Sequence, residues 1–319
     1  MAYIIAEIGF NHEGNLEAAK EMIHAAATAG ADAVKFQSFL AEDIALPDSE
    51  HFQAIQDAEM NAQMHHDLQK VATEAGVDFL STPFGLWAVD LLEELNVPAY
   101  KVASMDCTNH ILLKRIARTG KPIYLSTGMS TRDEIQNSLA FLKKQKSGPV
   151  TLLHCISKYP PEQSELNLAT IPLLAHELNV PVGYSDHFPG IEAAVTAVAL
   201  GASVIETHFT LDTNKEGGDH SHSADPAQLA ELVKRVVEIE TMCGTGDLEE
   251  TRPDRKLAQI FRRGLHAAQE IKAGQIITDN NLIVCRPSAP LGPNDWAKVK
   301  GRISKRSIKA GEALTKNVI

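Results

Sequence analysis

Short apolar runs alternate with longer segments in which apolar residues recur every three or four positions. The runs are typical of buried strands and the periodic segments of amphipathic helices. Helical segments such as 88–95, 111–119 and 132–143 separate the strands. The pattern predicts eight strands, at residues 3–8, 33–37, 78–81, 99–103, 122–125, 150–154, 181–184 and 203–206.

Eight strand–helix units in about 240 residues have the size and order of a TIM barrel, in which the active site lies at the carboxyl ends of the strands. The eighth helix has the clearest start, because Asp225 can cap it and Pro226 occupies its first position. A doubly wound α/β sheet is the alternative fold. We expect an α/β chain built on a (β/α)8 barrel.

The sequence changes character after residue 243. Residues 244–257 are polar and rich in Gly, Thr and charge, which is typical of a linker. Beyond them IKAGQIITDNNLI at 271–283 is echoed by IKAGEALTKNVI at 308–319. We therefore predict a barrel domain at 1–243, a linker at 244–257 and a small β-rich domain at 258–319, too small for a large core of its own.

Composition narrows the class of protein. The net charge of −11 argues against nucleic acid or an anionic membrane as a partner, and no apolar run is long enough to span a bilayer. The start, MAYIIAEIG, lacks the basic flank of a signal peptide, and the four cysteines form no paired motif. We expect a soluble cytoplasmic protein with reduced cysteines.

Two histidines follow neighbouring predicted strands. His187 stands in SDH and His208 in ETH, with Asp186 and Glu206 just before them. Parallel strands deliver such residues to one edge of the sheet, and imidazole is the commonest protein ligand of a divalent transition metal. The pair predicts half of a metal site, in preference to two unrelated hydrogen-bonded loop histidines.

Charged and hydroxyl side chains mark the ends of the earlier strands. Lys35 and Lys101 would be costly buried charges without an anionic partner. With hydroxyl residues nearby they predict a phosphate or carboxylate pocket. The alternative is that a lysine pairs with a barrel carboxylate such as Glu7. The hydroxyl residues at these strand ends are Ser81, Thr82, Ser104, Ser126 and Thr127.

Several stretches together resemble the sialic acid synthase family. They cover nearly the whole chain in one order, and the tail resembles that family's C-terminal antifreeze-like (SAF) domain. The stretches are AEIGFNHEG, GADAVKFQSF, FLSTPF, YKVAS, KPIYLSTGM, LLHCISKYP, GYSDH and ETHFT, followed by FRRGLHAAQEIKAG and VCRP in the tail.

The resemblance implies condensation of phosphoenolpyruvate with an N-acylated hexosamine of the N-acetylmannosamine type, giving a nonulosonic (sialic) acid and phosphate. Phosphoenolpyruvate would be held by Lys35, Thr82, Lys101, Ser104, Ser126, Ser157 and Ser185. His187 and His208 would hold a divalent metal, Mn²⁺ first and Mg²⁺ or Co²⁺ as alternatives. The sugar would be held by Glu7, Tyr159, Asp219 and, from the partner in a domain-swapped homodimer, Arg286.

Chemical roles follow from residue types. A metal at the strand ends can polarise the sugar aldehyde, and the catalytic group would comprise Glu7, His187, Glu206 and His208. Glu206 is assigned to positioning water for the second step, with pairing to a lysine as its alternative.

The chain departs from the family pattern in three places, of which the first borders the sugar site. The segment between residues 39 and 62 is short, and Ser157 stands where bacterial sialic acid synthases often have Asn. The turn GGDHSHS adds His220 and His222, which we expect to be solvated loop histidines rather than an accidental metal site.

The alternatives within enzymes are synthases of legionaminic or pseudaminic acid, which would take a diacetamido-hexose, and a spore-coat polysaccharide synthase. A non-enzymatic alternative is an inactive barrel that binds a glycan, against which the intact lysine and histidine sets argue.

Overall fold

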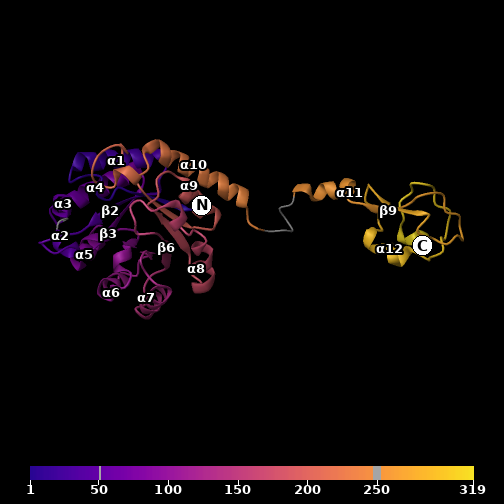
Figure 1. Ribbon diagram of the computed structural model, residues 1–319, viewed down its shortest axis with the longest axis horizontal. Helices are drawn as coiled ribbons and strands as arrows, with labels where there is room; N and C mark the ends of the chain where they lie inside the picture. The colour runs from indigo at the N-terminus through magenta and orange to yellow at the C-terminus, as the bar shows by residue number, and fades with distance from the viewer. Residues whose placement is uncertain (50–51, 247–252) are drawn as a thin grey trace. The chain divides into compact units, whose positions relative to one another are not determined.

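The computed structural model describes residues 1–49, 52–246 and 253–319. The chain divides into two compact units, Met1–Gly244 and Thr245–Ile319 (Figure 1). No helix in these ranges is both long enough and apolar enough to cross a membrane.

The first unit is a barrel of eight parallel strands. They lie in the order β3-β2-β1-β8-β7-β6-β5-β4, and β1 pairs with both β2 and β8. A doubly wound sheet reverses its strand order at a switch point, whereas this order is cyclic and sequential, so the TIM-barrel prediction is confirmed. The strands are β1 (Tyr3–Glu7), β2 (Ala33–Ser38), β3 (Asp78–Pro83), β4 (Tyr100–Val102), β5 (Ile123–Ser126), β6 (Val150–His154), β7 (Val182–Asp186) and β8 (Val204–His208).

Helices surround the strands (Figure 1). Each strand is followed along the chain by one main helix. These helices are α1 (Leu16–Ala29), α4 (Ala62–Ala75), α5 (Leu86–Glu94), α6 (His110–Ala117), α7 (Arg132–Lys144), α8 (Thr170–Leu178), α9 (Glu192–Ala199) and α10 (Pro226–Cys243). Two short helices, α2 (Ala41–Ile44) and α3 (Phe52–Asp57), follow β2, and single 3-10 turns lie at η1 (Ser104–Asp106), η2 (Gln163–Glu165) and η3 (His220–His222).

The start of α10 follows the sequence prediction. The Asp225 side chain accepts a hydrogen bond from the Gln228 amide at 2.8 Å, and Pro226 occupies the first turn, where no intrahelical donor is lost. Leu229, Leu232 and Val236 form its buried stripe. The helix therefore fixes the far end of the loop that leaves β8.

The barrel interior is apolar at the amino ends of the strands. Ile5, Leu80, Leu153 and Val204 pack there in a cluster that also contains Ala33 and Ala99. Because this layer closes the barrel below, the polar residues at the carboxyl ends face a cavity that opens on the other side.

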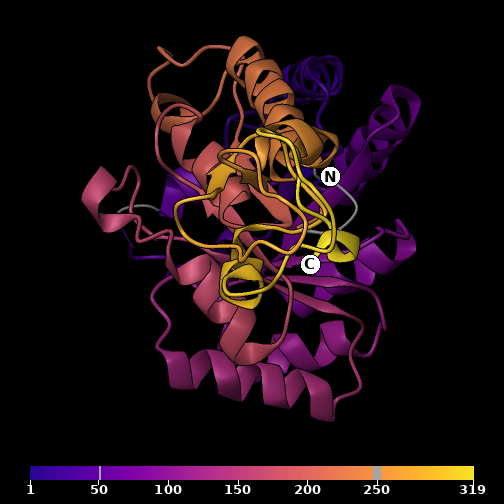
Figure 2. The ribbon, with the colours of Figure 1, turned by 90° about the vertical axis from the view of Figure 1, so that its right-hand side faces the viewer.

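The second unit is a small β-rich fold with its own core. β9 (Gly264–Ala267) pairs antiparallel with β10 (Leu282–Cys285), and loops make up most of the remainder (Figure 2). The two sequence repeats meet at an antiparallel bridge between Ile271 and Ile308, both fully buried. Its short helices are η4 (Pro253–Leu257), α11 (Ala258–Phe261), η5 (Pro293–Asp295), α12 (Trp296–Val299) and η6 (Lys316–Val318).

The linker predicted at 244–257 lies partly outside the described residues. Its last five residues form η4 and belong to the second unit, so they are not irregular. None of the four cysteines forms a disulfide in the part of the chain that the structure describes.

Candidate active site

A cavity of about 510 Å³ opens at the carboxyl ends of the barrel strands. Fourteen residues were assigned a catalytic, phosphoenolpyruvate-binding, sugar-binding or metal-binding role from the sequence, and thirteen of them line its walls: Glu7, Lys35, Thr82, Lys101, Ser104, Ser126, Ser157, Tyr159, Ser185, His187, Glu206, His208 and Asp219. The fourteenth, Arg286, belongs to the second unit, where it is exposed and its guanidinium lies 5.2 Å from the centre of the Phe261 ring.

Two lysines and two glutamates form a buried charge network on one side of the cavity. Lys35 Nζ lies 2.8 Å from Glu7 Oε2 and 3.6 Å from Glu206 Oε2, and Lys101 Nζ lies 3.4 Å from Glu206 Oε1. The pairing of Lys35 with Glu7, left open by the sequence, is therefore present. So is pairing of Glu206 with lysine. Both lysines nevertheless line the cavity, so these contacts do not remove them from a ligand's reach.

The network keeps the Glu206 carboxylate charged. Although burial opposes ionisation, Lys101 and Lys35 lower the pKa of Glu206 to about 2. Burial acts against Lys35 as well, yet Glu206 and Glu7 raise its pKa. Lys101 has less compensation: burial lowers its pKa despite Glu206, and the neighbouring Lys35 adds to the effect. Lys101 is thus the lysine that an incoming anion would stabilise most.

Hydroxyl groups complete this side, and two of them lack partners. Ser126 Oγ and Ser157 Oγ are buried without a hydrogen bond. Thr82 Oγ1 accepts from Lys35 Nζ at 2.9 Å, and Ser185 Oγ donates to Glu206 Oε1 at 2.8 Å. Buried polar atoms without partners are rare in folded proteins, which indicates a place for ligand oxygens.

Gly128 makes room for two of these hydroxyls. A Cβ at this position would lie 2.2 Å from Ser157 Oγ and 2.8 Å from Ser104 Oγ, both far inside contact distance. Its amide also donates to Ser104 Oγ at 3.1 Å. The glycine in the predicted stretch KPIYLSTGM is therefore required by close packing beside the cavity.

Imidazoles gather on the other side. The rings of His187 and His208 have centroids 5.3 Å apart, as expected for the ends of neighbouring strands β7 and β8. His187 Nδ1 donates to the Ile156 carbonyl at 2.8 Å, which leaves Nε2 for a ligand. Burial, reinforced by His208, lowers the pKa of His187 to about 3, so the ring is neutral at physiological pH. Tyr159 packs against His187 with centroids 4.3 Å apart.

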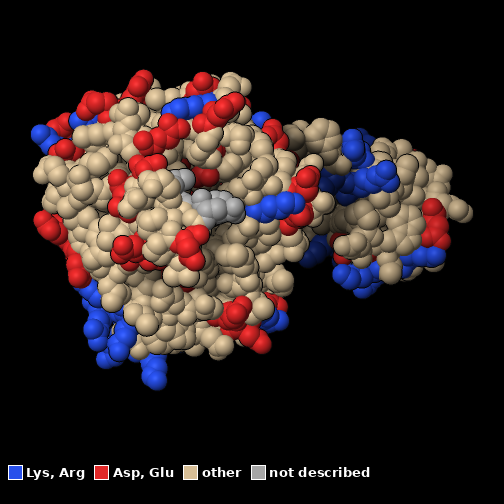
Figure 3. Space-filling model, turned by 60° about the vertical axis from the view of Figure 1, so that its left-hand side comes forward, with Lys and Arg blue, Asp and Glu red and all other residues tan. Residues whose placement is uncertain are grey.

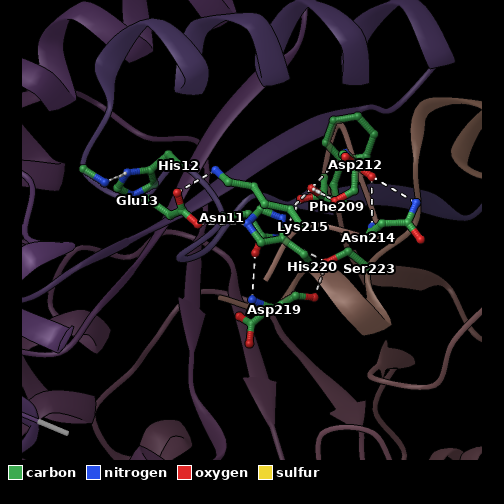
Figure 4. Close-up of polar contacts among 12 residues, drawn as sticks. Asn11, His12, Glu13, Phe209, Asp212, Asn214, Lys215, Asp219, His220 and Ser223 are labelled. Atoms are coloured by element: carbon green, nitrogen blue, oxygen red, sulfur yellow. Dashed lines mark hydrogen bonds and ion pairs between the residues drawn. The ribbon is translucent and has the colours of Figure 1, made fainter. Parts of the chain in front are cut away.

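The expectation that His220 and His222 are solvated is wrong. His220 is fully buried and only 5% of His222 is exposed. The reason is that the loop after β1 packs over this turn: Glu13 contacts both His220 and Lys215 (Figure 4). His222 faces the cluster instead, with its ring centroid 5.0 Å from that of His208.

His208 and Asp219 on this wall, together with the neighbouring His222, fit a divalent cation. His208 Nδ1 and His222 Nε2 are buried and have no hydrogen-bond partner, and the Asp219 carboxylate lies between them at 3.4 Å and 3.7 Å. Although burial opposes the charged ring of His208, Asp219, Glu7 and Glu206 together raise its pKa. Burial and His208 lower the pKa of His222 to about 4. Two neutral imidazoles and a carboxylate beside His208 are the donor types that first-row transition metals prefer.

Asn11 holds the loop that carries Asp219 (Figure 4). Its Oδ1 accepts from the Asp219 amide at 2.8 Å, and its Nδ2 donates to the Phe209 carbonyl and to Ser223 Oγ, both at 2.9 Å. Asn11 is fully buried. The sequence analysis did not single it out, although it stands within the stretch AEIGFNHEG.

One wall of the cavity is apolar and was not predicted from the sequence. It comprises Phe10, Ile44, Ile55, Phe84, Met105 and Met129. Ile44 and Ile55 come from α2 and α3, the segment between 39 and 62. The sequence could not predict that these two side chains face the cavity, because helices this short show no clear hydrophobic periodicity.

Two family models match most of the chain. The NeuB family model matches residues 22–248 and the SAF domain model matches residues 262–319. An N,N'-diacetyllegionaminic acid synthase of Campylobacter jejuni is 38% identical over 327 residues, covering 98% of each chain. An uncharacterized protein of Methanocaldococcus jannaschii is 43% identical over 285 residues, covering 89% of this chain and 85% of the other.

A solved structure shares the architecture at similar identity. The N-acetylneuraminic acid synthetase of Leptospira borgpetersenii, in complex with citrate, superposes with a TM-score of 0.78 at 37% identity, over 80% of this chain and 90% of that one.

Proposed function

The chain belongs to the NeuB family, and from that premise we propose that it condenses phosphoenolpyruvate with an N-acylated hexosamine to give a nonulosonic acid and phosphate. One observation carries the proposal. A single cavity holds two buried lysines with unpartnered hydroxyls on one side and a histidine–carboxylate group on the other. Such a cavity suits a phosphorylated acid beside a polarised carbonyl.

The lysine side would bind phosphoenolpyruvate. Lys35 and Lys101 supply charge, and Thr82, Ser104, Ser126, Ser157 and Ser185 supply hydroxyl groups for phosphate and carboxylate oxygens. An anion in this place would replace part of the contact that Glu206 now gives both lysines. Charge-assisted hydrogen bonds of this kind are the strong ones in proteins.

The histidine side would bind a divalent cation and the sugar. His187 and His208 would hold the ion, with Mn²⁺ as the first expectation and Mg²⁺ or Co²⁺ as alternatives. When bound, the ion supplies Lewis-acid polarisation of the sugar's aldehyde. Glu7, Tyr159 and Asp219, which line the same cavity, would orient the sugar hydroxyls.

The residues then have separate tasks in the reaction. A carbon–carbon bond forms between C3 of phosphoenolpyruvate and the aldehyde carbon, and water adds at C2 before the C2–oxygen bond to phosphate breaks. Glu206 is ionised and can accept a hydrogen bond from that water, because its pKa is about 2. Lys35 and Lys101 neutralise the departing phosphate.

The apolar wall bears on the choice of acceptor. Ile44, Ile55 and Phe84 offer surface to the methyl groups of N-acyl substituents. Acceptors with one acetamido group and with two both fit this description. An N-acetylmannosamine-type sugar therefore stays the first proposal, with diacetamido-hexoses, as in legionaminic or pseudaminic acid synthesis, and spore-coat polysaccharide synthesis as alternatives.

Phosphate release from phosphoenolpyruvate tests the function. We expect release that depends on an added N-acyl hexosamine and on a divalent metal, with the preferred sugar identified from a panel of mono- and diacetamido sugars. A folded protein that binds these sugars but releases no phosphate with any of them would instead support the inactive glycan-binding barrel.

A further inference from the structure

The turn η3 places the His222 imidazole beside His208 and Asp219. His208, Asp219 and His222 each offer one ligand atom, and these atoms lie within 4.8 Å of one another. Two ligands at about 2.1 Å from a tetrahedrally bound ion lie about 3.4 Å apart. The contacts of Asp219 with His208 at 3.4 Å and with His222 at 3.7 Å are close to that spacing.

The two imidazoles of this group are buried without a hydrogen-bond partner, and Asp219 beside them is half-buried. His208 Nδ1 and His222 Nε2 have almost no solvent exposure and no hydrogen bond. Leaving a buried polar nitrogen unsatisfied costs about 1–3 kcal/mol, and here two such nitrogens face one carboxylate. A cation would satisfy both nitrogens and the carboxylate at once.

The backbone that presents these groups is already ordered. The Ser223 hydroxyl, next to His222, donates to the Asp219 carbonyl at 2.7 Å, and Asn11 holds both residues from the other side (Figure 4). His220, two residues before His222, is fixed separately by Thr210 at 2.6 Å and by Glu13. The turn is therefore preorganised, so little ordering would accompany binding.

We propose that His222 is a metal ligand, joining His208 and the Asp219 carboxylate around one divalent first-row transition ion. This inference rests on the proposed function for the identity of the site and goes beyond the pair His187 and His208. The consequence concerns selectivity: an additional imidazole favours Mn²⁺, Co²⁺ or Zn²⁺ over Mg²⁺, whose preferred ligands are oxygens.

A packing role for His222 is the competing explanation. Its ring lies 5.0 Å from His208 and 5.6 Å from Tyr159, centroid to centroid, so it could serve only as a wall. Phenylalanine would preserve that ring and remove the ligand nitrogen. His222→Phe therefore separates the two explanations, with His222→Ala as the variant that loses both.

The test measures metal binding without turnover. Chelator-stripped wild type, His222→Phe, His222→Ala and the control His24→Ala, which removes an exposed imidazole on α1, are titrated with Co²⁺. Visible absorption reports the Co²⁺ coordination and competition with a chelator gives the affinity. We expect one ion per wild-type and His24→Ala chain, and affinity at least about tenfold weaker in both His222 variants with a changed spectrum.

Two results would overturn the inference. One is His222→Phe with wild-type affinity and spectrum, which assigns the residue to packing. The other is weakening in His24→Ala equal to that in His222→Phe. Circular dichroism and thermal unfolding show whether each variant is folded. Phosphate release is assayed separately, so turnover by a protein whose metal affinity ignores His222 would leave the proposed function standing and reject only this ligand.

Discussion

At the scale of single residues, the buried charges are the most informative. Lys35 and Lys101 could be identified in the sequence as candidate anion-binding residues, because a lysine at the end of an apolar strand is a costly buried charge unless it has an anionic partner. Their mutual arrangement was not recognisable, since both lysines meet Glu206, a residue of a strand more than a hundred positions away. Sequence spacing cannot report such a contact.

Lys35→Ala and Lys101→Ala should each raise the KM for phosphoenolpyruvate by about tenfold to hundredfold, with a smaller effect on the sugar. A hydrogen bond to a charged group contributes about 1.5–3 kcal/mol, which corresponds to that range. Steady-state kinetics with each substrate varied in turn measure it, and Lys70→Ala on the exposed face of α4 is the control. A rise confined to the sugar KM would move the anion pocket elsewhere.

His12 gives the barrel an acid-sensitive point. It is buried, its Nδ1 accepts from the Gly14 amide at 3.0 Å, and burial together with His65 lowers its pKa to about 4. The unfolded chain takes up this proton near pH 6.5 and the folded chain only near pH 4. Between those values the unfolded state binds more protons, so stability falls as the pH falls.

Between pH 6.5 and pH 4, His12 should lower the free energy of unfolding by up to about 1.4 kcal/mol for each unit by which the pH falls. Urea unfolding of chelator-treated wild type and His12→Gln at pH 6.5 and 5.5 measures the difference in slope. The glutamine keeps a neutral acceptor, so the variant should respond less to acid. Parallel losses in the two proteins would contradict this assignment.

At the scale of elements, the eight strands could be predicted because parallel strands buried on both faces are apolar throughout. The short helices α2 and α3 could not, since they have too few turns to show a period. The prediction that His222 is exposed to solvent was wrong for a different reason. GGDHSHS is polar and looks exposed, and only the packing of the β1–α1 loop over it, from the other end of the barrel sequence, buries it.

That loop also supplies a positioning residue. Asn11→Ala removes the three hydrogen bonds by which Asn11 holds the loop that carries Asp219. The sugar KM should therefore rise severalfold, while the phosphoenolpyruvate KM stays near its original value. The buried groups left without partners should also cost about 1–3 kcal/mol of stability. Kinetics and thermal unfolding measured on the same preparation report both effects. Equal rises in the two KM values would point to general loosening of the site.

At the scale of the whole molecule, the two units carry opposite charge. Thr245–Ile319 contains 14 Lys and Arg against 8 Asp and Glu, while Met1–Gly244 contains 16 against 33. Acidic side chains are spread over the barrel face shown in Figure 3. Opposite charges of this size favour docking of a second unit on a barrel, its own or that of another copy. The charges do not distinguish these two arrangements, and we propose the domain-swapped homodimer that the family resemblance implies.

Subunit exchange makes the choice. Lys101→Ala and Arg286→Ala proteins, each of low activity, are mixed and allowed to exchange. In a swapped dimer one site then carries both changes and the other carries neither, so activity should recover toward about a quarter of the wild-type value for statistical mixing. Mass spectrometry of tagged chains confirms exchange. Recovery absent after confirmed exchange would assign Arg286 to its own barrel.

The strand order has a last consequence, because the hydrogen-bonded sheet begins at β3 and ends at β4. These two strands lie side by side, yet no ladder joins them among the described residues. Thr82 and Lys101 line the cavity from opposite sides of this seam. The backbone amides of β3 and β4 should therefore exchange with deuterium sooner than those of β1 and β8, and phosphoenolpyruvate should slow them by tying the two edges together. Bound phosphoenolpyruvate would then connect β3 and β4, the two strands that no backbone ladder joins among the described residues.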